Sequence, residues 1–183
     1  MRPRPTSCGP PVAARPVPAA RTRYAAAVST AHASDSLAQR DVEPLIIAAI
    51  AEHVGAPLAP ARIEFEDGVR VELDGASEDR TVLVEAYAHV GALRGGQPKK
   101  LATDAFKLLW AGRKLEATRL VIAVIDVEVE QYLMRPKVWL TAALRDSGVE
   151  GVKVAIDGEA HARVEAAQRL QLMAPPGSAA HGA

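Results

Sequence analysis

Two acidic residues on neighbouring predicted strands are the first candidates for chemistry in this 183-residue chain. Asp74 ends an alternating apolar and polar run over residues 69–74, and Glu85 lies in a second predicted strand over residues 81–90. If the polar turn at 75–80 closes a hairpin, one register places Asp74 opposite Glu85. Because adjacent strands lie about 4.8 Å apart, both carboxylates can then share one divalent cation. This spacing predicts a Mg²⁺ or Mn²⁺ site whose ligands are Asp74 and Glu85.

A predicted helix over residues 97–113 adds a second line of polar groups. Gln97, Lys100, Asp104 and Lys107 recur at helical spacing, so they lie along one stripe of that helix. A lysine directed at two metal-bound acids is suited to phosphodiester hydrolysis. The cation polarises the phosphate and activates a water, and the lysine stabilises the developing negative charge.

The elements that must position these residues alternate between strand and helix periodicity. Ser34, Asp35 or Ser36 can cap a helix with apolar residues at Leu45, Ile46 and Ile50. Because Pro44 interrupts this helix, its strong part is expected to begin near Asp41, with the proline in the first turn. Three strands follow, with an Asp-Gly hairpin at 67–68 between the first two. After the helix at 97–113 come a buried strand at 118–127, a helical segment at 128–147 broken at Pro136, a strand at 152–156 and a helix at 159–172.

This order, α-β-β-β-α-β-α-β-α, predicts an α/β protein. A strand meander followed by βα alternation indicates one central mixed sheet with helices packed on it in a three-layer α/β/α arrangement. The folded part is expected to be a single domain over residues 35–172.

The charge of the chain divides between two regions. Lys plus Arg and Asp plus Glu are equal in number, which gives a net charge of zero. Residues 1–34 hold five Arg, no acidic residue and six of the 13 prolines, so the remainder carries a charge of −5. We expect residues 1–34 to be a disordered arm and residues 173–183 a flexible tail. An organelle transit peptide and a plain extension are alternative interpretations of the arm, and its proline density favours the extension.

Composition excludes several classes of protein. A single cysteine excludes an intramolecular disulfide framework and a thiolate-rich zinc site. No apolar run reaches the roughly 18–20 residues that span a bilayer, so we expect no membrane partner and a cytoplasmic location. No phosphate-binding loop of the strand-GxxxxGK[ST] type is present, which argues against nucleotide hydrolysis.

The motifs described so far resemble the PD-(D/E)xK nuclease superfamily, which has a restriction-endonuclease-like core. The resemblance rests on Asp74, on VEAYAHVG at 84–91 and on QPKKLATDAFKL at 97–108, and it covers residues 35–127. Small bacterial proteins of this superfamily share the pattern of an E-A-aromatic-A strand, a glycine loop and Q-x-x-K-x-x-x-D-x-x-K-L.

The resemblance implies a role for each matching residue. Asp74 and Glu85 match the two metal-binding acids, and Glu43 in the first helix matches an additional supporting acid. The superfamily's lysine, two residues after the second acid, is replaced here by Tyr87. Members that move this lysine to the following helix nominate Lys100, and less strongly Lys99, with Gln97 as a positioning group.

Three interpretations follow from these residues. The first is a Mg²⁺- or Mn²⁺-dependent nuclease acting on DNA or RNA, with Asp74, Glu85, Lys100, Glu43 and Gln97 as its site. The second is a catalytically inactive module of the same fold that binds nucleic acid or a partner protein, with a homodimer as one possibility. The third is a small α/β protein without an active site, in which Asp74 with Gly75 is a turn pair and Lys100 with Asp104 an ordinary helix ion pair.

Overall fold

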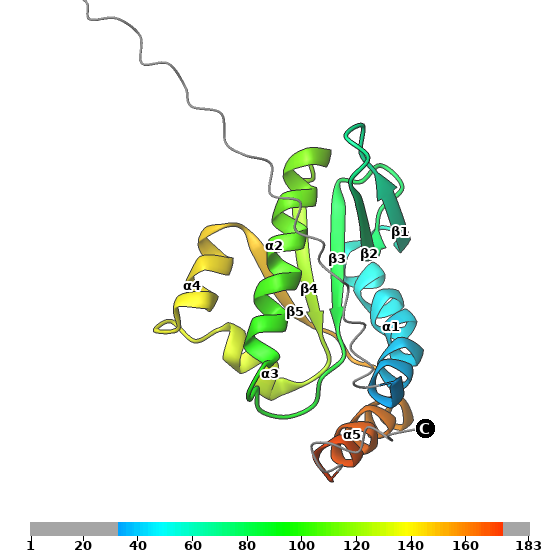
Figure 1. The fold of residues 1–183 in the computed structure, drawn as a ribbon, viewed down its shortest axis with the longest axis vertical. Coiled ribbons are helices and arrows are strands. Elements are labelled where there is room, and N and C mark those ends of the chain that lie inside the picture. Colours follow the sequence, from blue (N-terminus) through cyan, green and yellow to red (C-terminus); the bar gives the residue numbers. More distant parts are fainter. Residues whose placement is uncertain (1–32, 174–183) are drawn as a thin grey trace, which may run out of the picture. The chain divides into compact units, whose positions relative to one another are not determined.

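The computed structural model describes residues 33–173. The expected arm over residues 1–34 lies outside this range except for its last two residues, and the expected tail over residues 173–183 lies outside it except for Met173. Within this range a five-stranded mixed sheet has the order β1-β2-β3-β4-β5 (Figure 1). Pairing is antiparallel from β1 to β3 and parallel from β3 to β5. The strands are β1 (Ala59–Glu64), β2 (Arg70–Ala76), β3 (Val82–Tyr87), β4 (Arg119–Val124) and β5 (Val149–Lys153).

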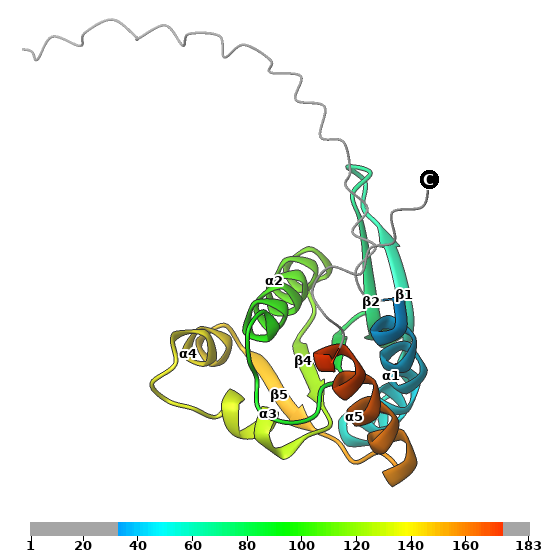
Figure 2. The same ribbon diagram turned by 60° about the horizontal axis from the view of Figure 1, so that its bottom comes forward.

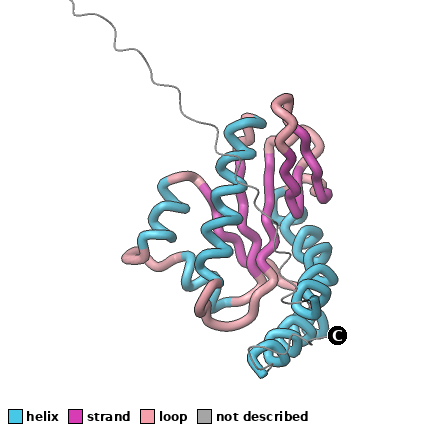
Figure 3. Tube along the Cα trace, in the orientation of Figure 1, coloured by secondary structure: helices cyan, strands magenta, loops and turns pink. Residues whose placement is uncertain are grey.

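Helices cover both faces of the sheet, which confirms the predicted α/β architecture (Figures 2 and 3). The described helices are α1 (Ala33–Val54), α2 (Gln97–Leu115), α3 (Val127–Leu133), α4 (Trp139–Asp146) and α5 (Gly158–Met173). One apolar cluster joins the sheet to α2, α3 and α4, and a second joins it to α1 and α5. The apolar run of β4 lies between these clusters, so Val121 to Val124 are buried from both sides. Among residues 33–173, no helix combines the length and the apolar character that a membrane crossing requires.

Some predicted boundaries are wrong because tertiary packing decides them. α1 starts at Ala33, close to the possible caps at residues 34–36, and it continues through Pro44 instead of being interrupted there. The fully buried Val42, Ile46 and Ile50 anchor this helix, and their packing offsets the hydrogen bond that proline removes. β5 begins at Val149 rather than at 152, because its parallel register pairs Val149 with Leu120.

Asp74 and Gly75, the predicted turn pair, lie in a bulge within β2 and not in the turn that follows this strand. Ala61 pairs with Leu73 and Ala59 pairs with Ala76, so β2 holds one extra residue, at Asp74–Gly75. A Cβ on Gly75 would lie 2.9 Å from Ile47 Cδ1, so a larger residue where the bulge packs on α1 would require the end of the Ile47 side chain to shift. Bulges redirect side chains and interrupt regular strand pairing, and this bulge does so at Asp74.

Candidate active site

The candidate site lies where β2 and β3 separate. Their pairs are Gly75–Val84 and Ala76–Leu83, and the same register continued places Asp74 opposite Glu85, as predicted from the sequence. The ladder stops at this point. The backbone N–H of Ala86 instead donates to Asp74 Oδ2 at 2.8 Å. We call Asp74, Gly75, Glu85 and Ala86 the strand fork.

The carboxylate of Asp74 therefore has a structural role that a substitution can measure. Ala86 is 4% exposed, so removing its acceptor leaves a buried N–H without a partner. We expect Asp74→Ala to lower the free energy of unfolding by about 1–3 kcal/mol, and Asp74→Asn, which keeps an oxygen acceptor, by less than about 1 kcal/mol. Urea unfolding of both variants measures the difference. Equal stability of the two variants would contradict this role.

Glu85 is the most deeply buried acid of the fork. Its side chain is 3% exposed, and Lys107 Nζ lies 2.5 Å from Oε2. Oε1 is buried and has no hydrogen-bond partner among the described residues. Burial and, to a smaller extent, the charge of Asp74 raise the pKa of Glu85, Lys107 opposes both effects, and the resulting pKa is about 8. Metal-free Glu85 therefore holds a proton at neutral pH.

The lysine that reaches the fork is Lys107, not Lys100. Lys100 Nζ binds Asp104 Oδ2 at 2.8 Å and lies 5.2 Å from the centroid of the Tyr87 ring. Lys107 belongs to the same polar stripe of α2, three residues after Asp104, so the helical spacing contained the signal for it. The sequence could not show which member of the stripe lies beside Glu85.

Gln97 holds the loop that connects β3 to α2. Its Nε2 lies 3.1 Å from His89 Nδ1, and its Oε1 accepts from the backbone N–H of Arg94 at 2.6 Å. Ten residues separate Gln97 from Lys107, which is about 15 Å along the helix. Gln97 therefore positions the loop and lies away from the two acids.

Tyr87 lies two residues after Glu85, where the resemblance described above would place a lysine. The ring is 3% exposed, and the hydroxyl donates to the backbone carbonyl of Gln97 at 3.4 Å. Burial, followed by the charge of Asp104, raises the pKa of Tyr87 above its ordinary value. Tyr87 therefore stays neutral and cannot supply the positive charge of a lysine.

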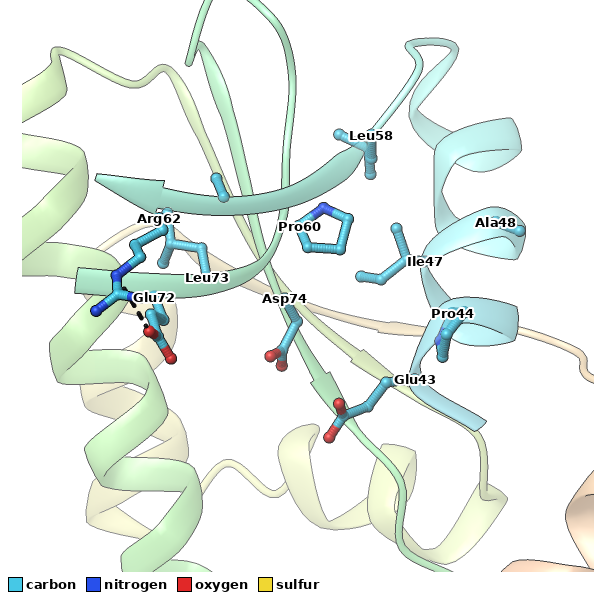
Figure 4. Close-up of a pocket in the computed structure, with 11 residues that line it drawn as sticks. Glu43, Pro44, Ile47, Ala48, Leu58, Pro60, Arg62, Glu72, Leu73 and Asp74 are labelled. Carbon is cyan, nitrogen blue, oxygen red and sulfur yellow. Dashed lines mark ion pairs between the residues drawn. The ribbon is translucent and has the colours of Figure 1, made fainter. Parts of the chain in front are cut away.

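Glu43 and Asp74 line one pocket between α1 and the β1–β2 hairpin (Figure 4). The pocket has a volume of about 560 Å³, and its walls are mostly apolar. Both carboxylates lie at one end of it, whereas the ion pair of Arg62 with Glu72 lies elsewhere on its rim (Figure 4). The structure thus brings Glu43 from α1 to the same pocket as Asp74.

Glu72 does not join the fork, although it precedes Asp74 by only two residues. Val71 and Leu73 pack in the α2-side cluster, so Glu72 points to the opposite face of the sheet. Glu85 contacts Lys107 of α2 and therefore faces the other way. Asp74, at the bulge, is the acid of β2 whose charge acts on Glu85.

The donor set at the fork suits a hard divalent cation. Residues 33–173 contain no group of three or more His, Cys, Asp or Glu side chains that could hold a metal ion. Mg²⁺ is usually bound through one or two carboxylates, with waters and substrate phosphates completing its shell. Asp74 and the buried Oε1 of Glu85, which lacks a hydrogen bond in the described region, fit that mode of binding.

The fork thus combines two neighbouring acids, a lysine on one of them and a third acid in the adjoining pocket. Comparisons of the chain with known protein families, curated proteins and solved structures find no match. The chemistry of these side chains is therefore the basis on which a function is proposed.

Proposed function

We propose that this protein is a Mg²⁺- or Mn²⁺-dependent nuclease, a phosphodiesterase built on a restriction-endonuclease-like core. One observation carries the proposal: Glu85 is 3% exposed and keeps a buried oxygen without a hydrogen bond within the described region, beside a second acid. Buried polar atoms almost always have partners, and one that lacks them calls for an explanation such as an ion. The order of helix, three-strand meander, helix and strand supports the same core.

The proposed roles follow from the contacts of each side chain. Asp74 and Glu85 hold the cation, with Glu43 as a supporting acid at the pocket end. When bound, the cation polarises the phosphate and lowers the pKa of a water. Lys107, about one-third exposed, can donate from Nζ to a phosphate oxygen and stabilise negative charge there. Gln97 keeps the β3–α2 loop in place.

Calorimetric titration with MnCl₂ tests the proposed ligands. We expect saturable binding to the full chain that tightens as pH rises, because two acids form the site and the cation must displace the proton of Glu85. Asp74→Asn keeps the hydrogen bond to Ala86 but loses the charge, so it should weaken binding at least about tenfold. Binding that is unchanged in Asp74→Asn would contradict the assignment.

A second candidate function is a catalytically inactive module that binds nucleic acid or a partner protein. Two observations favour it: buried Tyr87 stands two residues after Glu85, where the resemblance would place a lysine, and Lys107 already contacts one oxygen of Glu85. This candidate requires no cation at the fork. Saturable Mn²⁺ binding that depends on Asp74 would therefore count against it.

A further inference from the structure

The outer face of α2 carries a stripe of residues that the proposed site does not use and that is exposed except at half-buried Trp110. Helical spacing aligns five residues on the side opposite buried Leu101 and Leu108. Phe106 is 72% exposed at the centre of this stripe. We call it the outer stripe: Lys99, Thr103, Phe106, Trp110 and Arg113.

The charge of α2 is opposite to that of the rest of the fold. The helix contains five basic residues and one acidic residue, a net charge of +4, whereas residues 35–183 as a whole carry −5. Three of its lysines form ion pairs, with Asp104, Glu85 and Asp67. Lys99 and Arg113 are exposed and form no ion pair with any described residue, so both can contact an anion.

The stripe places an aromatic ring between two cations at equal spacing. Phe106 lies seven residues from Lys99 and seven from Arg113, which is about 10 Å along the helix in each direction. Proteins that bind single strands combine cations for the backbone with aromatic rings on which bases stack. A base inside a duplex cannot offer its face to Phe106, whereas an unstacked base can.

The stripe runs beside the strand fork. Lys107 follows Thr103 by four residues and precedes Trp110 by three, so its side chain borders the stripe. At the far end, the rings of Trp110 and Phe65 pack edge to face with centroids 4.9 Å apart. Lys114 Nζ lies 5.6 and 5.4 Å from these two rings. A strand lying on the stripe would therefore pass Lys107 and end against the β1–β2 hairpin.

We propose that the outer stripe of α2 binds single-stranded nucleic acid, with Phe106 stacking on a base and Lys99 and Arg113 contacting phosphates. This inference rests on the proposed function for what happens to the bound strand, and binding itself can be measured without cleavage.

Fluorescence anisotropy in EDTA tests the stripe with labelled dT and rU 20-mers and a duplex of equal length. We expect Phe106→Ala of the full chain to bind both single strands at least about fivefold more weakly, and Phe106→Trp to bind them like the wild type. Lys99→Gln and Arg113→Gln should each lower the slope of log affinity against log salt by about 0.7. Duplex affinity should be lower than single-strand affinity and insensitive to Phe106→Ala.

Trp139→Ala is the matched control, since Trp139 is 76% exposed on α4 and lies off the stripe. It should bind as the wild type does, and thermal unfolding verifies that both alanine variants fold. Absence of single-strand binding, tighter duplex binding, or an equal loss in Trp139→Ala would each overturn the inference. Binding that depends on Phe106 without any Mg²⁺-dependent cleavage would support the stripe and refute the nuclease. Cleavage without dependence of binding on Phe106 would refute the stripe alone.

Discussion

Glu85→Gln is expected to lower the rate of Mg²⁺-dependent cleavage at least about 100-fold relative to the wild-type protein. Glutamine has the size of glutamate and keeps an oxygen for Lys107, whose Nζ contacts Oε2. It cannot carry the negative charge that a hard cation requires. Changes to groups that merely support metal ligands commonly cost 10–100-fold, so removal of a ligand charge should cost at least the upper figure. Initial rates on a labelled oligonucleotide, measured in excess Mg²⁺, give the ratio.

Glu72→Gln is the matched control for this experiment. Glu72 lies on the same strand as Asp74 but is exposed, faces the other side of the sheet and pairs with Arg62. Its loss should leave the cleavage rate unchanged. A Glu85→Gln protein that is as active as the Glu72→Gln protein would refute the role of Glu85 as a ligand.

Lys107→Met is expected to destabilise the metal-free protein in a way that grows with pH. The pKa of Glu85 is raised from 4.5 to about 8 in the folded state. An acid whose pKa is raised on folding stabilises the fold fully below its unfolded pKa, here 4.5, and this contribution is lost as pH rises through 8. Beyond that pH, wild-type Glu85 is ionised and paired with Lys107, so stability no longer falls on its account. Without Lys107 the pKa rises further and stability keeps falling.

The loss of stability in Lys107→Met should be larger at pH 9 than at pH 6. At pH 6, where Glu85 is protonated in both proteins, the variant loses about 1 kcal/mol of hydrogen bonding. At pH 9 we expect the loss to reach about 2 kcal/mol, because each further unit of pH adds about 1 kcal/mol. Urea unfolding in EDTA at the two pH values measures both quantities. In a Glu85→Gln background, Lys107→Met should show no such pH dependence, and a dependence that persists there would contradict the account.

The fold could be predicted largely from local patterns. Strand alternation, the Asp-Gly hairpin and the break at Pro136 each predicted an element that the structure contains. The register of β2 with β3 was also predictable, because a turn of known length fixes which residues oppose each other. The continuation of α1 through Pro44 was not predictable from sequence, because it depends on the buried Ile46 and Ile50 that stabilise the helix.

The candidate site was predictable only in part, for a similar reason. Alternation placed Asp74 and Glu85 together, but the bulge packs Gly75 against Ile47, which lies 28 residues earlier in the sequence. The choice between Lys100 and Lys107 depends on how far along β3 the helix lies, which no local pattern encodes.

The burial of the two tryptophans was also predictable only in part. As large apolar side chains, Trp110 and Trp139 are both expected from the sequence to pack rather than to stack on bases. Trp110 does pack against Phe65, whereas Trp139 is 76% exposed, so the prediction is wrong for Trp139. Its helix, α4, covers the sheet through Leu140 and Leu144, and this leaves its first residue outside the core.

The central claim is that Asp74 and Glu85 serve metal-dependent cleavage of nucleic acid. Its most direct test incubates the full-length wild-type protein with labelled single-stranded and duplex oligonucleotides in Mg²⁺, in Mn²⁺ and in EDTA, beside Asp74→Asn. The account predicts cleavage by the wild type that requires the cation and that Asp74→Asn lacks, although this variant stays folded. No cleavage in either cation, or equal cleavage by Asp74→Asn, would contradict it.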